Sequence, residues 1–364
     1  MAQHLAKKQN FFVKAFIPNK MDSKGAIIRK IVVFLCLAIF IGCAVYVLGD
    51  YSNRKTDENL VNDIRDTIQL NASGSFSASK EQIENIKQEV PEILDKFVDT
   101  YAENSDLIGW LKVGHYIDYP VMMHETIDDY YLYRNFYKED SQSGSIFCDN
   151  HVQPITDANN LVIYGHNMAS GEYFNALSWF NPYSHRYNNT EGFTDYYKQY
   201  PTFEFDTLYE EGTYKIFAGI YINTEDKDGY PYPYYRKRQF KSEYEFMDFM
   251  GNIMDRSMFY TDVDVEYGDQ IITLSTCYWR PLGESVDARF ALFARKVREG
   301  ESPEVDVDKI TINPSPLYFD AYYRIMGTEW QGRKWDLSLV KDFDKYSDQI
   351  DSQDELEPVT KTEE

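Results

Sequence analysis

The sequence has only four cysteines in 364 residues, and they form neither a disulfide framework nor a metal-binding pattern. Cys36 and Cys43 lie in an apolar run, which leaves Cys148 and Cys277 for the polar part of the chain. A single Cys148–Cys277 bridge is an alternative to two free thiols. The histidines also lack the HExxH and HxH spacings of metal sites. We therefore expect no metal and no other cofactor.

Positive charge is scarce as well, with 37 Lys and Arg against 59 Asp and Glu and a formal net charge of −22. Seven of the positive residues and a single negative one fall within residues 1–30. An acidic body repels phosphate backbones, so we expect no nucleic-acid partner. Hydrophobic residues make up 43% of the chain, which is enough for a sizeable core and excludes wholesale disorder. Internal repeats are lacking, which disfavours solenoids and propellers.

One long uncharged run occurs, from residue 31 to residue 49. With the apolar residues 26–28 upstream, it is long enough to span the hydrocarbon of a bilayer as a helix. A cleaved signal peptide is the alternative, but its apolar region is shorter and a small-residue cleavage site follows it. Because positive residues precede the run, we predict a cytoplasmic basic segment (1–30), a single-pass transmembrane anchor (31–49) and an extracellular remainder at the cell membrane.

The rest of the chain divides into a polar linker (50–80), a domain (81–299) that begins with helices, and an acidic extension (300–364) whose last part we expect to be disordered. Apolar spacing predicts a helix over 81–105, in which Pro91 is either a kink or the first turn of a second helix. It also predicts an inserted helix over 242–259, which opens with Ser242 and Glu245 in capping-box spacing. Short β-prone runs separated by turn residues indicate a mainly β domain, with a barrel as the favoured form. The expected strands are 117–123, 144–149, 160–166, 202–209, 213–223, 270–277 and 288–297.

Cys277 ends the expected strand 270–277, and alternation puts Thr273 and Ser275 on its face. A polar face that ends in cysteine suits a pocket wall, although a buried, inert cysteine is an equal alternative. His166 ends the expected strand 160–166, where a lone histidine is more often a surface residue than a catalyst. A cysteine and a histidine on different strands are nevertheless the minimum set for thiol catalysis.

Arg289 opens the strand that follows Cys277. If the two strands pair as an antiparallel hairpin, Arg289 lies near Cys277, where a guanidinium favours a thiolate and binds a developing oxyanion. A surface salt bridge to Asp287 or Glu284 is the alternative role for this arginine. Arg280 is a second candidate, closer to Cys277 in sequence but in the intervening loop.

Several of these segments resemble the class B sortases. TLSTC (273–277), the RF-containing strand after it and NLVIYGHNM (160–168) are typical of sortases in general. The segments that resemble class B more particularly are NSDLIGWLKVGHYIDYPVMM (104–123), DDYYLYRNF (128–136), GSIFCD (144–149), YPTFEFDTLYEEGTYKIFAGIYI (200–222) and the helix-bearing stretch 236–259. The resemblance covers about residues 100–298, and residues 300–364 extend beyond it.

The resemblance implies an eight-stranded sortase β-barrel with an N-terminal helical extension and an inserted helix before the cysteine strand. It assigns catalysis to Cys277, His166 and Arg289, with Arg280 kept as the alternative arginine. It also assigns Ser275 to the substrate pocket and Thr276 to the oxyanion hole.

The function implied is that of a cysteine transpeptidase of Gram-positive cell surfaces. It would cleave a C-terminal sorting motif of secreted proteins through a thioacyl intermediate and transfer them to a peptidoglycan precursor amine. The alternatives are a pilus-assembling sortase with a pilin lysine as nucleophile, a cysteine peptidase that only hydrolyses, and a catalytically silent sortase-like surface binding protein.

Overall fold

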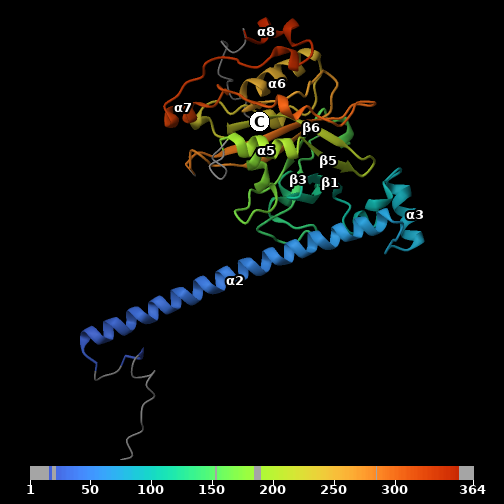
Figure 1. Cartoon of the computed structure of the whole chain (residues 1–364). Coiled ribbons are helices and arrows are strands. Elements are labelled where there is room, and N and C mark those ends of the chain that lie inside the picture. The colour runs from blue at the N-terminus through green and yellow to red at the C-terminus, as the bar shows by residue number, and fades with distance from the viewer. Residues whose placement is uncertain (1–15, 19–21, 152–153, 184–189, 284, 352–364) are drawn as a thin grey trace, which may run out of the picture. The chain divides into compact units, whose positions relative to one another are not determined.

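The computed structural model describes residues 16–18, 22–151, 154–183, 190–283 and 285–351 (Figure 1). The chain divides into two compact units, residues 1–60 and residues 61–364. The first contains the apolar part of one long helix, and the second contains a β-barrel with its surrounding helices.

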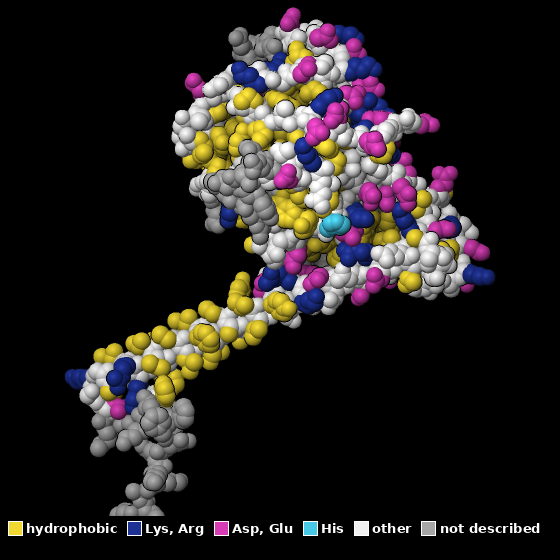
Figure 2. All heavy atoms as spheres, viewed as in Figure 1, with side chains coloured by type: hydrophobic (Ala, Val, Ile, Leu, Met, Phe, Trp, Pro, Cys, Tyr) yellow, Lys and Arg dark blue, Asp and Glu magenta, His cyan; other side chains and the backbone are white. Residues whose placement is uncertain are grey.

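The long helix, α2, spans Lys24–Ala72. Large apolar side chains in its N-terminal part are exposed, and Figure 2 shows them along the visible face of this part of the helix. By length and composition α2 is able to cross a membrane, which is compatible with the predicted anchor.

The polar segment 50–80, expected as a linker, is helical as far as Ala72. Within the second unit, Val61 and Ile64 are buried, and Arg65 Nε lies 2.7 Å from the Asp118 carboxylate. Asn, Asp and Ser in this segment favour loops, but residues 50–71 contain neither proline nor glycine that would interrupt a helix. Packing against the barrel unit therefore decides the conformation of residues 61–72.

Eight strands close into a barrel in the order β1-β2-β3-β4-β8-β9-β6-β5. The β2–β3 and β4–β8 pairs are parallel, and the pairs β1–β2, β3–β4, β8–β9, β9–β6, β6–β5 and β5–β1 are antiparallel. The strands are β1 (Leu107–Val113), β2 (Ile117–Met122), β3 (Ile146–Cys148), β4 (Asn160–Tyr164), β5 (Thr202–Thr207), β6 (Thr213–Asn223), β8 (Ile271–Cys277) and β9 (Ala288–Lys296). A short pair outside the barrel joins β7 (Phe259–Tyr260) to β10 (Thr311–Ile312). The mainly β barrel expected from the sequence is confirmed.

Two hydrophobic clusters account for the burial of both barrel faces. The first contains the even-numbered residues Ile272 and Leu274 of β8 together with Leu292 of β9. The second lies between the other barrel face and helix α6, and it contains Ile271 and Phe293. Because both faces are covered, ten of the eleven residues of β6 are buried. These two layers hold β8 and β9, and therefore Cys277 and Arg289, on a rigid support.

Helix α6 (Glu243–Arg256) is the inserted helix expected before the cysteine strand. The Ser242 hydroxyl accepts a hydrogen bond from the Glu245 backbone N–H at 3.2 Å, so the helix begins with an N-cap as the sequence predicts. The other α-helices are α3 (Lys80–Glu89), α4 (Val98–Glu103), α5 (Thr190–Gln199), α7 (Asp320–Met326) and α8 (Ser347–Asp351). The short 3₁₀ turns include η2 (Tyr130–Tyr133), η4 (Phe174–Phe180), η5 (Asp226–Asp228) and η6 (Tyr234–Arg236).

The described part of the C-terminal extension, residues 300–351, packs on the domain. Figure 1 shows its orange and red chain passing over α6 to α8. Phe319 and Trp335 are buried in the first and second cluster, respectively. The expected disordered tail falls on residues 352–364, which lie outside the described residues.

Candidate active site

Cys277 is the last residue of β8, and its cross-strand partner on β9 is Arg289. Directly paired residues of an antiparallel sheet point to the same face, so the thiol and the guanidinium share one side of the barrel. Burial raises the pKa of the Cys277 thiol, Arg289 acts to lower it, and Asp287 acts to raise it. The net shift is upward, so the thiol form of Cys277 dominates at neutral pH.

Arg289 forms an ion pair with a carboxylate and interacts electrostatically with the Cys277 thiol. Its side chain is 27% exposed and forms an ion pair with Asp287. Burial opposes the charge of Arg289, but Cys277 and Asp287 outweigh it and raise the pKa of the guanidinium. The salt bridge weighed from the sequence is therefore present, and it coexists with the electrostatic contact to Cys277. Glu284, the other partner considered, lies outside the described residues.

Asp287 is itself held by Thr224, which follows β6. The Thr224 hydroxyl donates to the Asp287 carboxylate at 2.8 Å, and the Thr224 backbone N–H donates to the Asp287 carbonyl at 3.0 Å. Burial acts to raise the pKa of Asp287, but the bonds to Arg289 and Thr224 lower it overall. Asp287 is therefore ionised at neutral pH and fixes one side of the guanidinium.

His166 lies two residues beyond the end of β4, the strand that pairs in parallel with β8. Its Nε2 is 2.8 Å from the backbone oxygen of Leu132, and its ring centroid is 5.5 Å from that of Tyr133. Because a carbonyl only accepts hydrogen bonds, Nε2 carries the proton in this contact. Nδ1 is then the nitrogen that remains for proton exchange. Among the residues that the structure describes, no hydrogen bond or ion pair joins His166 to Cys277.

Asn167 connects the histidine segment to the cysteine strand. Its Nδ2 donates to the backbone oxygen of Cys277 at 2.8 Å, and its Oδ1 accepts from Asn175 Nδ2 at 2.7 Å. The backbone N–H of Phe174 also donates to the His166 carbonyl at 2.9 Å. These bonds fix the residues beside His166 relative to Cys277 without involving either reactive side chain.

Ser275 and Thr276 face opposite sides of β8. Ser275 is buried on the Cys277 side, where its hydroxyl is 2.6 Å from that of Tyr234. Burial raises the pKa of Tyr234 to about 12, so the phenol is protonated at neutral pH. Thr276 donates from its hydroxyl to the Gly165 carbonyl at 2.7 Å, directly before His166. The Thr276 side chain therefore braces the histidine segment.

The other candidate residues lie elsewhere. Arg280 is exposed in the loop after β8. Cys148 is buried, and burial raises the pKa of its thiol well above the usual value. Cys148 and Cys277 are both free, so the alternative of a single bridge is not realised. Within the described ranges, no group of three or more His, Cys, Asp and Glu side chains is arranged to hold a metal.

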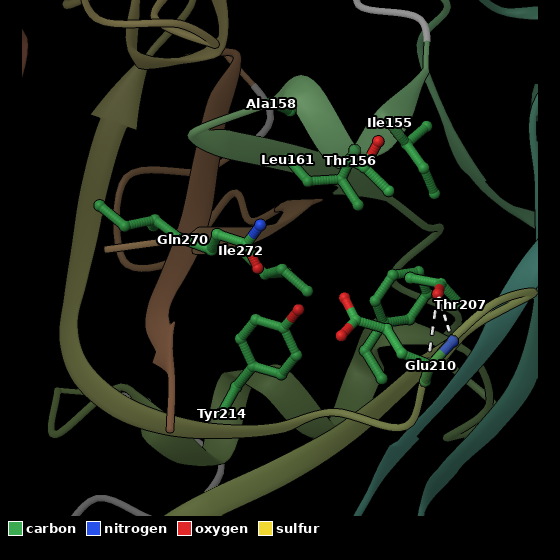
Figure 3. A pocket seen from close by; sticks show the side chains of 11 residues that line it. Ile155, Thr156, Ala158, Leu161, Thr207, Glu210, Tyr214, Gln270 and Ile272 are labelled. Atoms are coloured by element: carbon green, nitrogen blue, oxygen red, sulfur yellow. Dashed lines mark hydrogen bonds between the residues drawn. The ribbon is translucent and has the colours of Figure 1, made fainter. Parts of the chain in front are cut away.

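A small cavity of about 30 Å³ lies at the opposite end of the barrel (Figure 3). Glu210, Tyr214, Gln270 and Ile272 are among its lining residues. Ile272 is five residues before Cys277, which is about 16 Å along an extended strand. The cavity has space for only a few water molecules, so it is not the reaction site.

Two curated sortases are similar to this chain in sequence. Sortase B of Listeria monocytogenes is 32% identical over 188 residues, which cover 51% of this chain and 68% of the relative. Sortase B of Staphylococcus aureus is 28% identical over 175 residues, which cover 48% of this chain and 64% of that relative. No protein-family model matches the chain.

Solved structures of sortase B have the same fold. Those from B. anthracis and S. aureus each give a TM-score of 0.52, at 23% and 22% identity. Each alignment covers 68% of this chain and 99% of the other. The chain belongs to the sortase B family. It is a cysteine transpeptidase of the sortase type, as the sequence resemblance predicts.

Sequence reasoning missed three contributors to the site: Asn167, Tyr234 and the backbone oxygen of Leu132. Asn167 stood beside His166 in the sequence, but its bond to Cys277 depends on the parallel β4–β8 pairing. That pairing joins residues about 110 positions apart, and local patterns carry no signal for it. Asp287 was named only as an ion-pair partner, without its link to Thr224.

Proposed function

We propose that Cys277, His166 and Arg289 catalyse a transpeptidation at the outer face of a cell membrane. The substrate is a C-terminal sorting motif of a secreted protein, and the acceptor is an amine of a peptidoglycan precursor. The observation that supports the proposal most directly is the pairing of Cys277 with Arg289 across β8 and β9, with the segment of His166 bound to the carbonyl of Cys277.

In the first half-reaction, the Cys277 thiolate attacks the carbonyl carbon of the scissile peptide bond. The carbonyl electron pair moves to oxygen, and Arg289 together with a backbone N–H stabilises the resulting oxyanion. When the oxyanion collapses, the C–N bond breaks. The leaving amine takes a proton from the His166 imidazolium, and a thioester on Cys277 remains.

In the second half-reaction, the acceptor amine attacks the thioester carbonyl and transfers a proton to neutral His166. The C–S bond breaks, and the electron pair returns to sulfur as the thiolate. Since Nε2 donates to Leu132, Nδ1 is the atom that exchanges the proton in both steps. The Leu132 contact holds the ring through the change between its two protonation states.

The active form needs a deprotonated Cys277 and a protonated His166. The upward shift of the Cys277 pKa makes that pair a minority state near neutral pH. We therefore expect a bell-shaped dependence of kcat/KM on pH. A flat profile from mildly acidic to mildly basic pH would contradict this assignment.

The long apolar helix α2 supports a proposal for the localisation of the protein. We propose that residues 31–49 span the membrane with the basic residues 1–30 in the cytoplasm and the barrel outside. Secreted substrates and lipid-linked precursors meet at that surface, so tethering raises their effective concentration at the enzyme. External protease on intact cells should digest the barrel and leave an epitope at the N-terminus intact. Protection of the barrel instead would refute the orientation.

The decisive experiment is intact-protein mass spectrometry of the chain in detergent micelles, mixed with a panel of sorting-motif peptides. We expect a covalent mass increase equal to the N-terminal peptide fragment, and none in Cys277→Ala. Adding peptidoglycan-type amines or a pilin lysine peptide then identifies the acceptor. A product that is always the free acid would favour a hydrolase, and the absence of any adduct would favour a silent binding protein.

A further inference from the structure

The C-terminal extension is anchored at the end of α6 by a buried carboxylate. Asp255 accepts hydrogen bonds from Arg333 at 2.7 and 2.9 Å and from the Trp335 indole N–H at 2.7 Å. Its backbone oxygen also accepts from the Leu317 N–H at 2.8 Å. The stretch between Leu317 and Arg333, which contains α7, is therefore held at both ends by one residue of α6.

This stretch packs aromatic rings against the barrel beside the cysteine. The rings of Tyr318, Phe319 and Tyr322 lie 5.5–6.3 Å from that of Tyr221 on β6. The Tyr221 ring in turn lies 6.0 Å from that of Tyr278, the residue directly after Cys277. The extension thus supports the start of the loop that joins β8 to β9.

The same stretch touches the loop after β6. Gly229 has φ +115°, and a Cβ placed there would lie 2.6 Å from the Asp320 backbone nitrogen. Asn223 closes this loop by donating from Nδ2 to the carbonyls of Glu225 at 2.8 Å and Gly229 at 2.6 Å. Asp320 at the start of α7 and Gly229 at the end of the loop 224–229 are therefore in direct backbone contact, with no room for a side chain between them.

The loop leads back to the arginine of the site. Thr224, its first residue, bonds to Asp287, and Asp287 is paired with Arg289. A continuous series of contacts accordingly runs from Asp320 through Gly229 and Thr224 to the guanidinium that faces Cys277. The contacts are hydrogen bonds, an ion pair and close backbone packing.

We propose that residues 317–323 are a buttress that positions Arg289 against Cys277, acting through the loop 224–229. Phe319 and Asp320 are positioning residues in this arrangement, since neither touches the reacting atoms. The inference rests on the proposed roles of Cys277 and Arg289, and it gives the C-terminal extension a part in the reaction.

Gly229→Ala in the full-length protein in detergent tests the buttress, because the new methyl group must displace Asp320 or the loop. Gly268→Ala is the matched control, since Gly268 has φ +104° and no atom lies within 4 Å of the position that its new methyl group would take. Both variants carry similar backbone strain, and only Gly229→Ala disturbs the contact.

The readout is the rate of alkylation of Cys277 by iodoacetamide against pH, followed on the Cys277 peptide by mass spectrometry. The charged and titratable groups that interact with the thiol are Arg289 and Asp287 on the β9 side and Tyr234 on η6. His166 follows β4, the strand that pairs with β8. Displacing Arg289 removes the cation that favours the thiolate. We therefore expect the pH midpoint of Cys277 alkylation to rise by about one pH unit in Gly229→Ala. The Gly268→Ala midpoint should equal that of the wild type.

Thioacylation by a cleavable sorting-motif peptide gives the second readout. A displaced guanidinium should lower kcat about 10- to 100-fold with little change in KM. If Gly229→Ala fails to fold, Phe319→Ala and its control Phe319→Leu replace it. We then expect Phe319→Leu to retain activity and Phe319→Ala to lose it. A folded Gly229→Ala with the wild-type midpoint and kcat would overturn the buttress. A shifted midpoint in a protein that cleaves no peptide would support the buttress and count against the proposed function instead.

Discussion

Arg289 interacts with the Asp287 carboxylate and with the Cys277 thiol, and these two interactions have to be balanced. Its guanidinium is bound by the Asp287 carboxylate and faces the Cys277 thiol. Asp287 keeps the arginine in place, but its own negative charge acts against the thiolate. Asp287 thus has two opposing effects on the thiolate: it holds Arg289 in place, which favours the thiolate, and its negative charge disfavours it. The balance between these effects sets the fraction of Cys277 that is ionised at a given pH.

Removing each charge separately should shift the Cys277 pKa in opposite directions. Arg289→Met removes a charge that lowers the pKa, so alkylation of Cys277 should move to higher pH. Asp287→Asn removes a charge that raises the pKa, so alkylation should move to lower pH. Alkylation rates measured from about pH 5 to about pH 10, on either side of the ordinary thiol pKa, test both signs. Shifts in the same direction would show that Asp287 acts only by placing Arg289.

For peptide cleavage, Arg289→Met should lower kcat about 100- to 1,000-fold, as expected for the loss of one oxyanion donor. Arg280→Met is the control, because Arg280 is exposed in the loop after β8. Steady-state cleavage of a fluorogenic peptide measures both variants. A larger loss in Arg280→Met would transfer the oxyanion role to that arginine.

Asn167 is a single residue that holds the segment of His166 in place through its hydrogen bond to the Cys277 carbonyl. Asn167→Ala should lower kcat more than it changes KM, because the segment of His166 loses its bond to the Cys277 carbonyl. The hydrogen bond itself is worth about 1 kcal/mol of stability. Asn175→Ala, which removes the hydrogen bond to Asn167 Oδ1, should give a smaller loss of kcat. Equal losses of stability with unchanged kcat in both variants would restrict Asn167 to folding.

At the scale of elements, α6 stands out because it is covered on two sides, by the barrel and by the C-terminal extension. Gly251 of α6 lies against the Phe343 ring, where a methyl group would come within 2.9 Å. Phe343 is fully buried, and it is packed against Trp335 at a ring distance of 4.8 Å. The extension is therefore an integral layer of the domain over its described part.

Asp255→Ala should destabilise the protein by about 3–5 kcal/mol, because it leaves the Arg333 guanidinium and the Trp335 N–H without their carboxylate. Asp255→Asn keeps the shape and one acceptor, so it should cost less. Asp262→Asn, in an exposed pair with Lys309, should have the smallest effect. Urea unfolding followed by tryptophan fluorescence ranks the three, and a different order would contradict the anchoring role of Asp255.

The elements differ in how far the sequence could predict them. Strand 213–223 was predicted to the residue, and the strand that ends at Cys277 was predicted to within one residue. The helix capped by Ser242 begins as predicted but ends three residues earlier, at Arg256. Alternation and capping are local signals, which is why these elements could be predicted. Strand β1 was not predicted, because six of its seven residues are buried and the run LIGWLKV has no alternation. Helix α5 was missed because its many aromatic residues favour strands.

At the scale of the whole molecule, carboxylates around Arg295 make stability depend on pH. Arg295 is 1% exposed and binds Glu301 and Asp264. The bonds to Arg295, and further to Lys215, lower the pKa of Glu301 well below its usual range. A carboxylate with a lowered folded pKa stabilises above its unfolded pKa, and this stability is lost as pH falls through the folded value.

The free energy of unfolding should accordingly fall as pH drops below about 4.5, the ordinary value for glutamate. Glu301→Gln should be less stable than the wild type at about pH 7, and the difference should shrink towards about pH 3. Urea unfolding at several pH values measures it, with Glu304→Gln at an exposed position as the control. A constant difference across this range would mean that Glu301 acts by packing alone.

The proposed catalytic set could be named from the sequence because three short motifs carry it, but the contacts that hold these residues in place could not be predicted. The contact between Asp320 and Gly229 joins residues 91 positions apart, and the bond from Asn167 to Cys277 joins residues 110 positions apart. Such contacts follow from barrel closure and from the course of the extension. Neither barrel closure nor the course of the extension produces a periodic or compositional pattern in a single sequence.

Barrel closure also limits how a substrate chain can be recognised. An open sheet offers a free edge to which an extended polypeptide can add as a further strand, and partly unfolded secreted proteins supply such segments in abundance. Here every barrel strand has two neighbours, so the sheet has no free edge to offer. An extended peptide must be selected by side chains and loops at one end of the barrel. Promiscuous backbone pairing with an extended chain is thereby excluded for the closed barrel sheet.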